Sequence, residues 1–267
     1  MPIAKELRLI LSCLFLLSFE SNAETALGLS TNFQYFDYEE YDLNNISLNH
    51  EEGILPGLQG FLTTSTHKIT HTFMASIHAA DVDYDGQLQN GSPHKTKTNT
   101  TLFNLGYRLS YPVYLDDIFI HSQLNWDHWN RSIRATTFVS GLDEAYSWPS
   151  IDLGFSYIPI RTNKHKLIIE VAYTKIFEGN FEVDLSDLGY GIQELNLGDG
   201  NGYQSQISYQ YTLNKKTYAS LNLLYKTWSF ARSNIKTTSN GSNTISFVEP
   251  RSESKRIGLS FTLNFIL

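Results

Sequence analysis

The sequence is nearly devoid of cysteine. Its only cysteine is Cys13, which lies inside an apolar N-terminal run. The preceding 10–12 segment, Ile-Leu-Ser, is faintly similar to a lipoprotein cleavage box, but the apolar run continues past Cys13, which favours an ordinary export signal. The rest of the chain therefore has no thiol, and this excludes disulfide bonds, thiol catalysis and thiolate metal sites from it.

Long apolar segments and a basic surface are also missing. After the N-terminal run, no stretch is apolar over the ~20 residues that a membrane helix needs. The chain has 27 acidic and 20 basic residues, a net charge of -7, and no basic stripe. This charge pattern argues against a nucleic-acid partner. Aromatic residues, in contrast, are plentiful: 16 Tyr, 16 Phe and 4 Trp.

The first 23 residues have the pattern of a secretory signal. Lys5 and Arg8 precede an apolar run that ends at Phe19, and small residues follow up to Ala23. This run is too short to span a membrane as a helix. We expect cleavage after Ala23, so that residues 1–23 are a signal peptide and residues 24–267 form the mature domain.

The end of the chain shows strict alternation between apolar and polar residues. Alternation with a period of two places the two sets on opposite faces of a β-strand. Polar or small residues separate the members of an unbroken apolar row: Ile257, Leu259, Phe261, Leu263, Phe265 and Leu267. The pattern predicts a strand with one wholly apolar face at the carboxyl terminus.

The same alternation recurs along the mature chain and predicts about ten strands. The predicted strands lie near residues 26–36, 53–63, 69–80, 103–111, 117–130, 151–157, 167–174, 201–213, 217–230 and 255–267. The predicted long loops are 37–52, 81–98, 131–148, 179–200 and 231–253, and the short turns are 64–68, 112–116, 161–166 and 214–216. Long and short connections therefore alternate.

This alternation of connections favours a transmembrane antiparallel up-and-down β-barrel over a soluble β-sandwich. Outer-membrane barrels have even strand numbers, short periplasmic turns and longer outer loops, with aromatic girdles at both interfaces. A closed barrel also leaves no strand edge unpaired in lipid. We therefore expect an all-β monomer in the bacterial outer membrane. Its expected partners are the lipid bilayer, lipopolysaccharide and the outer-membrane assembly machinery.

Several segments resemble known outer-membrane barrels. The ending Arg256-Ile-Gly-Leu-Ser-Phe-Thr-Leu263 is similar to the final strands of that class, and the strand number and loop order are similar to those of the omptin proteases. Residues 35–41, 53–57, 83–87 and 141–148 resemble segments of a family of small outer-membrane barrels. This last resemblance implies no activity.

The omptin resemblance implies paired aspartates on one side of the barrel mouth and an Asp/His pair on the other. Asp81, Asp83 and Asp85 lie where the first pair would be, but the chain has no histidine between Ile176 and Leu213. The required proton acceptor is therefore missing from that segment. No catalytic residue is assigned, and we expect no enzymatic activity. An omptin-like protease or another barrel hydrolase is the remaining catalytic alternative.

The three aspartates also suggest a weak calcium site. Asp81, Asp83 and Asp85 occupy alternate positions before Gly86, as in the first half of a calcium-binding loop. In an extended strand their carboxylates would lie ~7 Å apart on one side. They would either remain solvated or converge on a cation. Ser92 stands where such a loop needs its bidentate Glu, so any affinity would be in the millimolar range.

Polar residues on the inward register predict a packed lumen. A narrow barrel places five charged side chains close together: Arg108, Asp127, Glu170, Lys226 and Arg256. Because burying single charges is costly, we expect them to form a paired polar network that closes the barrel. The function expected is a structural or surface-binding role carried by the outer loops, with no cofactor. A narrow pore for small solutes is the alternative.

Overall fold

The computed structural model describes residues 24–66, 68–88 and 91–267. The predicted signal peptide and Cys13 lie outside these residues. The described chain is almost entirely strand, and none of its helices is long and apolar enough to span a membrane. The barrel strands are β1 (Glu24–Tyr41), β2 (Ser47–Thr66), β3 (Ile69–Gln87), β4 (Pro93–Tyr114), β5 (Ile118–Ile133), β6 (Leu142–Arg161), β7 (His165–Ile176), β10 (Gly200–Asn214), β11 (Thr217–Phe230) and β14 (Arg251–Ile266).

These ten strands form a closed antiparallel barrel. Each strand pairs with its neighbour along the chain, and β1 pairs with β14 from Ala26 opposite Ile266 to Tyr41 opposite Arg251. Closure leaves every barrel strand paired on both sides, which satisfies the backbone in lipid. The predicted fold class is therefore confirmed.

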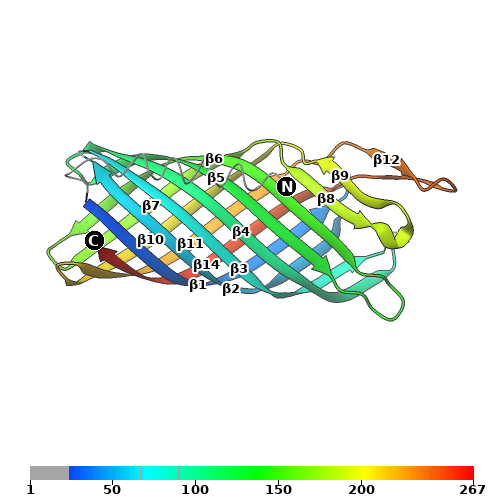
Figure 1. Ribbon diagram of the computed structural model, residues 1–267, viewed down its shortest axis with the longest axis horizontal. Coiled ribbons are helices and arrows are strands. Elements are labelled where there is room, and N and C mark those ends of the chain that lie inside the picture. Colours follow the sequence, from blue (N-terminus) through cyan, green and yellow to red (C-terminus); the bar gives the residue numbers. More distant parts are fainter. Residues whose placement is uncertain (1–23, 67, 89–90) are drawn as a thin grey trace.

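The two ends of the barrel differ (Figure 1). At the end we call the turn end, short turns join the strands, and the start of β1 lies beside the end of β14. At the opposite end, the hairpin end, β8 (Asn180–Leu185) and β9 (Gly191–Asn196) form an extra hairpin joined by a 3-10 turn (Ser186–Leu188). β8 pairs with the first part of β6, and β12 (Lys236–Ser239) with β13 (Thr244–Phe247) forms a separate ribbon.

The outward side chains form an apolar belt that begins at the turn end. On β1 the outward row is apolar from Leu27 to Tyr35 apart from Thr31, and Leu27, Leu29 and Phe33 are exposed. This length matches the ~9–11 residues that a β-strand needs to cross a bilayer. Other strands contribute equivalent exposed residues, including Ile77, Leu124, Leu153, Val171, Leu223 and Leu259. The predicted register of these strands agrees with their positions.

The strands continue well beyond the apolar belt, and this corrects the predicted loops. β1 has 18 residues and β4 has 22, so about half of each strand lies outside the belt. The predicted loops 37–52, 81–98 and 131–148 are wrong, because most of their residues belong to paired strands. Beyond the belt the outward residues are polar. A strand segment with a polar outer face has the amino-acid composition of a loop, and for this reason these segments were predicted as loops.

The inward residues divide the barrel into two halves. On β1 they begin as small or polar residues and then become aromatic before ending in an acid: Gly28, Ser30, Asn32, Gln34, Phe36, Tyr38 and Glu40. The change from Gln34 to Phe36 occurs near the edge of the apolar belt that faces the hairpin end. The half within the belt therefore has a polar interior, and the half at the hairpin end has a packed one.

Candidate functional site: the barrel interior

An aromatic layer fills the barrel on the hairpin-end side of the apolar belt. Trp129 on β5 lies edge-on to Tyr38 on β1, with ring centroids 4.8 Å apart, and stacks on Tyr146 of β6 at 4.7 Å. Tyr146 also contacts Phe181 of β8 at 4.7 Å. The further members of this layer are buried as well: Phe36, Leu55, Val82, Leu102, Trp148, Ile176, Trp228 and Phe230. Packed side chains from most strands thus occupy the cross-section of the barrel.

A buried arginine lies beside the aromatic layer. Arg131 on β5 is 2% exposed, and its Nε donates to Glu51 Oε1 of β2 at 2.8 Å. Its Nη1 donates to Glu40 Oε1 of β1 at 3.1 Å and also to Glu144 of β6. We call these four residues the arginine cluster. Charge-assisted hydrogen bonds to three other strands tie the barrel wall together across its interior.

The arginine cluster holds more acid than base. The segment before β14 contributes Glu249, whose Oε1 accepts a hydrogen bond from the Tyr146 hydroxyl at 2.9 Å. Three carboxylates therefore contact one guanidinium, and the buried carboxyl group of Glu249 joins them through the Tyr146 hydroxyl. Burial raises the pKa of Glu144 to about 7 and raises that of Glu249 well above its ordinary value. Both groups lie outside the apolar belt, at the level of outward acids such as Asp143.

Sequence reasoning missed this cluster entirely. Glu40, Glu51, Arg131 and Glu144 all fell in predicted loops, although each continues the inward register of a predicted strand. Arg131, for example, lies two residues beyond Trp129, and both are buried. Continued period-two spacing across the polar segments was the signal that could have identified it.

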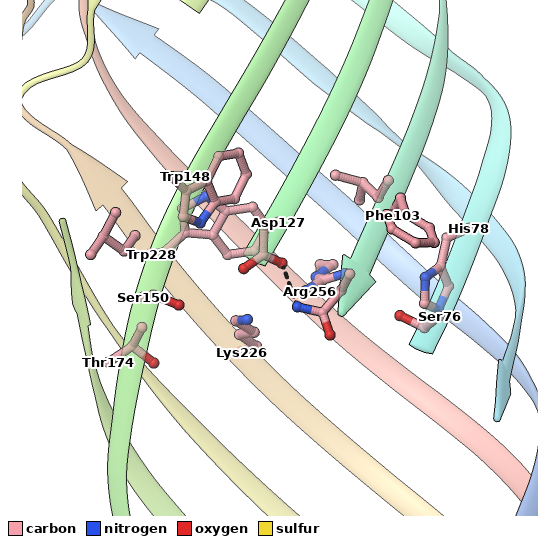
Figure 2. Close-up of a pocket in the computed structure, with 13 residues that line it drawn as sticks. Ser76, His78, Phe103, Asp127, Trp148, Ser150, Thr174, Lys226, Trp228 and Arg256 are labelled. Carbon is pink, nitrogen blue, oxygen red and sulfur yellow. Dashed lines mark hydrogen bonds between the residues drawn. The ribbon is translucent and has the colours of Figure 1, made fainter. Parts of the chain in front are cut away.

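The five lumen residues predicted from the sequence lie on the inward face in two groups. Arg108 Nη1 pairs with Glu170 Oε2 at 2.8 Å, and Arg108 Nε donates to Gln123 Oε1 at 2.7 Å. The second group is Asp127, Lys226 and Arg256, which lie around one pocket (Figure 2). The register of β4 and β5 places Asp127 farther from the turn end than Arg108. These five residues line the lumen but do not close it; the aromatic layer and the arginine cluster do.

The second group is not a simple set of ion pairs. Asn104 Nδ2 donates to Asp127 Oδ1 at 3.0 Å, the contact drawn in Figure 2. The guanidinium of Arg256 lies 5.0 Å from the centre of the Trp228 ring, and Lys226 Nζ lies 5.9 Å from the same centre. Both cations therefore lie close enough to the Trp228 ring for cation–π interactions.

A cavity of about 620 Å³ runs from the turn end to the middle of the barrel. Glu24 and Lys166 lie toward its mouth, and polar residues such as Gln34 and Gln206 line its walls. Lys226 and Arg256 mark its blind end, next to Trp228 and the aromatic layer. The lumen is thus a pocket with one closed end.

The three aspartates of the predicted calcium site lie on the outer surface of β3. Asp81 Oδ2 pairs with Arg134 Nη2 at 2.6 Å, Asp83 Oδ1 pairs with Lys97 Nζ at 2.8 Å, and Asp85 pairs with Lys95. Their like charges are relieved by these basic partners. Across residues 24–66, 68–88 and 91–267, no three His, Cys, Asp or Glu side chains are grouped as metal ligands would be. The calcium site stays a prediction.

Two histidines outside the 176–213 segment, His128 and His71, have partners in the structure. His128 Nε2 lies 3.0 Å from Asn130 Oδ1, and the His128 ring stacks on Trp126 at 5.6 Å. His71 Nδ1 lies 2.9 Å from the Tyr107 hydroxyl. Neither contact supplies the acid–base pair or the Ser–His pair that a hydrolase needs.

Comparison with known proteins identifies the fold class. No family model matches the chain, and no curated protein matches it. Among solved structures, the chain is similar to the outer membrane protease OmpT from Escherichia coli, with a TM-score of 0.60 and 10% identity, over 93% of this chain and 98% of that one. It also matches the beta domain of the Bordetella autotransporter BrkA (TM-score 0.45, 9% identity, 91% and 100% covered). A third match is the translocator domain of the autotransporter NalP from Neisseria meningitidis (TM-score 0.43, 10% identity, 97% and 95% covered). The chain therefore has the fold of the bacterial outer-membrane β-barrels.

Proposed function

We propose that the protein is a closed outer-membrane barrel whose hairpin end faces the cell surface and serves a structural or surface-binding role. Short turns are periplasmic in such barrels and longer connections are external, which sets this orientation. The protein would be a monomer, inserted by the outer-membrane assembly machinery. It would be surrounded by lipids that include lipopolysaccharide.

The observation that carries this proposal is the packed interior of the hairpin end. The aromatic layer is buried, and beside it Arg131 forms hydrogen bonds with side chains of three other strands. A solute would have to displace buried rings and break charge-assisted hydrogen bonds to pass. Since protein interiors are close-packed and relax little, the barrel does not act as a pore.

The hairpin end also presents apolar side chains to water. Phe138, in the turn between β5 and β6, is 95% exposed, Ile192 on β9 is 63% exposed and Ile235 before β12 is 71% exposed. These residues lie beyond the apolar belt, so lipid does not cover them. Exposed apolar side chains are suited to binding, and this supports a surface-binding role.

The cysteine-free mature chain allows a direct test of the orientation. Phe138→Cys would place a single exposed thiol at the hairpin end, and Lys164→Cys would place one at the turn end. A membrane-impermeant maleimide applied to intact cells should label the first variant and spare the second until the cells are opened. Labelling of Lys164→Cys alone would reverse the orientation, and labelling of neither on opened cells would contradict the exposure of both sites.

A solute-exclusion assay tests the closed state. Liposomes that contain the refolded protein, diluted into isotonic solutions of small sugars, should swell no faster than liposomes without protein. Swelling that depends on the amount of protein and decreases with sugar size would support the narrow pore instead.

A further inference from the structure

Two cations face each other at the blind end of the lumen cavity. Lys226 on β11 and Arg256 on β14 are directly opposite in the strand register, and both side chains point inward. Like charges opposite each other on paired strands are destabilising. We call these two residues the basic pair. Their placement needs a compensating negative charge.

The described residues supply only part of that charge. Within the described chain, no carboxylate oxygen lies within 4.0 Å of the cationic nitrogens of either residue, and Arg256 Nε is buried without a hydrogen-bond partner. Asp127 lines this end of the cavity and accepts from Asn104. The buried Asp152 on β6 accepts from Asn125, Thr174 and Gln204. Among the described residues, neither acid forms an ion pair with the basic pair.

A second observation comes from His78 on β3. Its side chain lines the blind end and the residue is 3% exposed, yet Nε2 has no hydrogen-bond partner within the described chain. Buried polar atoms are normally satisfied by protein, water or a ligand. Figure 2 shows His78, Arg256 and Lys226 around the same space. Three separate strands therefore place incompletely satisfied nitrogen-bearing side chains around one pocket.

The charge of the whole cavity points in the same direction. Four basic residues line it, Arg108, Lys166, Lys226 and Arg256, against the acids Glu24 and Glu170. Glu170 is paired with Arg108. The side chains that line the cavity surface are thus more basic than acidic, while the acids Asp127 and Asp152 are buried beside it. Charges inside low-dielectric walls concentrate the field and attract opposite charge.

We propose that the blind end of the cavity binds a small soluble oxyanion, a phosphate or carboxylate group, that enters from the turn end. Lys226 and Arg256 supply the charge and the hydrogen-bond donors, and Asn104 and Ser76 lie beside them. The cavity that leads to this end has a volume of about 620 Å³, within the range of cavities that admit small molecules, about 300–1,000 Å³. The site lies deep inside the barrel, which favours a free solute over the headgroup of a membrane lipid.

Titration calorimetry with the refolded full chain tests the proposal. Inorganic phosphate and citrate are the probes, and chloride is the comparison anion. We expect saturable binding of at least one oxyanion. Arg256→Gln and Lys226→Gln should each weaken it about tenfold or more, because each loses a charge-assisted hydrogen bond.

Lys255→Gln is the matched control. Lys255 is adjacent to Arg256 on β14 but points outward, where its Nζ pairs with Asp37 at 3.2 Å. This variant should bind as the wild type does. Thermal unfolding adds a second readout: phosphate should raise the Tm of the wild type and of Lys255→Gln but not that of the two basic-pair variants.

Two outcomes would overturn the site. One is the absence of oxyanion binding by a correctly folded wild-type barrel. The other is equal binding by the wild type and by Arg256→Gln or Lys226→Gln. Because the two substitutions are on different strands, failure of one variant to fold leaves the other as a valid test.

Discussion

Arg131 Nε on β5 donates a hydrogen bond to Glu51 Oε1 on β2 at 2.8 Å, across 80 residues of sequence. Their strands, β5 and β2, do not pair with each other. The contact therefore spans the interior instead of following the sheet. The hairpin end of the barrel therefore contains a packed core with its own buried ion pairs.

Removing the arginine should destabilise the barrel strongly. Arg131→Met leaves the carboxyl groups of Glu40, Glu51 and Glu144 buried without their cation, and breaking a buried pair in this way costs about 3–5 kcal/mol. Urea unfolding in lipid vesicles measures the loss.

Arg134→Met is the control for that measurement. Arg134 also forms an ion pair, with Asp81, but both side chains are more than one third exposed. Exposed pairs contribute about 0–1 kcal/mol. Equal losses for the two variants would mean that Arg131 has no special role in the core.

The acid surplus of the arginine cluster predicts that stability depends on pH. Burial raises the pKa of Glu144 to about 7 and raises that of Glu249. A carboxyl group with a raised pKa binds its proton more tightly in the folded state than in the unfolded state. Its contribution to stability is therefore fully present below the unfolded pKa of about 4.5 and is lost as pH rises through the folded pKa.

Comparison of the wild type with Glu249→Gln isolates this effect. Glutamine can still accept from the Tyr146 hydroxyl but cannot ionise. Between pH 5 and pH 8, we expect the free energy of unfolding to fall more steeply for the wild type than for the variant. Identical slopes for the two proteins would contradict the raised pKa of Glu249.

The outward register makes a separate prediction about the lipid face. Leu153 on β6 is 55% exposed and lies within the apolar belt. Leu105 on β4 also points outward. Substitution of either by Arg should cost about 2–4 kcal/mol near the bilayer midplane. Asn104→Ala should cost less, about 1 kcal/mol, because it removes one hydrogen bond to Asp127. Should Leu105→Arg fold into vesicles as well as Asn104→Ala, the register of β4 would be wrong by one residue.

The sequence was sufficient to predict the part of the barrel that lies in lipid. There, rows such as Leu27, Leu29 and Phe33 on one face and Ser30 and Asn32 on the other leave little ambiguity, because lipid and lumen select opposite residue types. The strand number and the closed topology follow from those rows.

On the hairpin-end side of the belt, the two faces of a strand no longer differ clearly in polarity. Asp37 and Glu39 face water, while Tyr38 and Glu40 face the core, so polar residues occupy both faces. Without the apolar alternation, the segment has the composition of a loop. The arginine cluster was therefore hidden in predicted loops.

Cross-strand partners were equally inaccessible from the sequence. Asp81 and Arg134 form an ion pair across 53 residues, and this pair depends on the register of β3, β4 and β5. The sequence shows three alternating aspartates but gives no sign of the basic residues that flank them in space. The calcium hypothesis was formed without that information and stays a prediction.

Single-channel recording in planar bilayers tests the closed barrel most directly. The account predicts that the inserted wild-type protein shows no stepwise conductance, because the aromatic layer and Arg131 fill the hairpin end. Phe138→Cys, recorded in the same way, reports insertion, because a membrane-impermeant maleimide should label its exposed thiol from only one side of the bilayer. The contradicting result is a stepwise conductance that shrinks in Gln34→Trp, which narrows the lumen, but not in Phe33→Trp, which faces lipid.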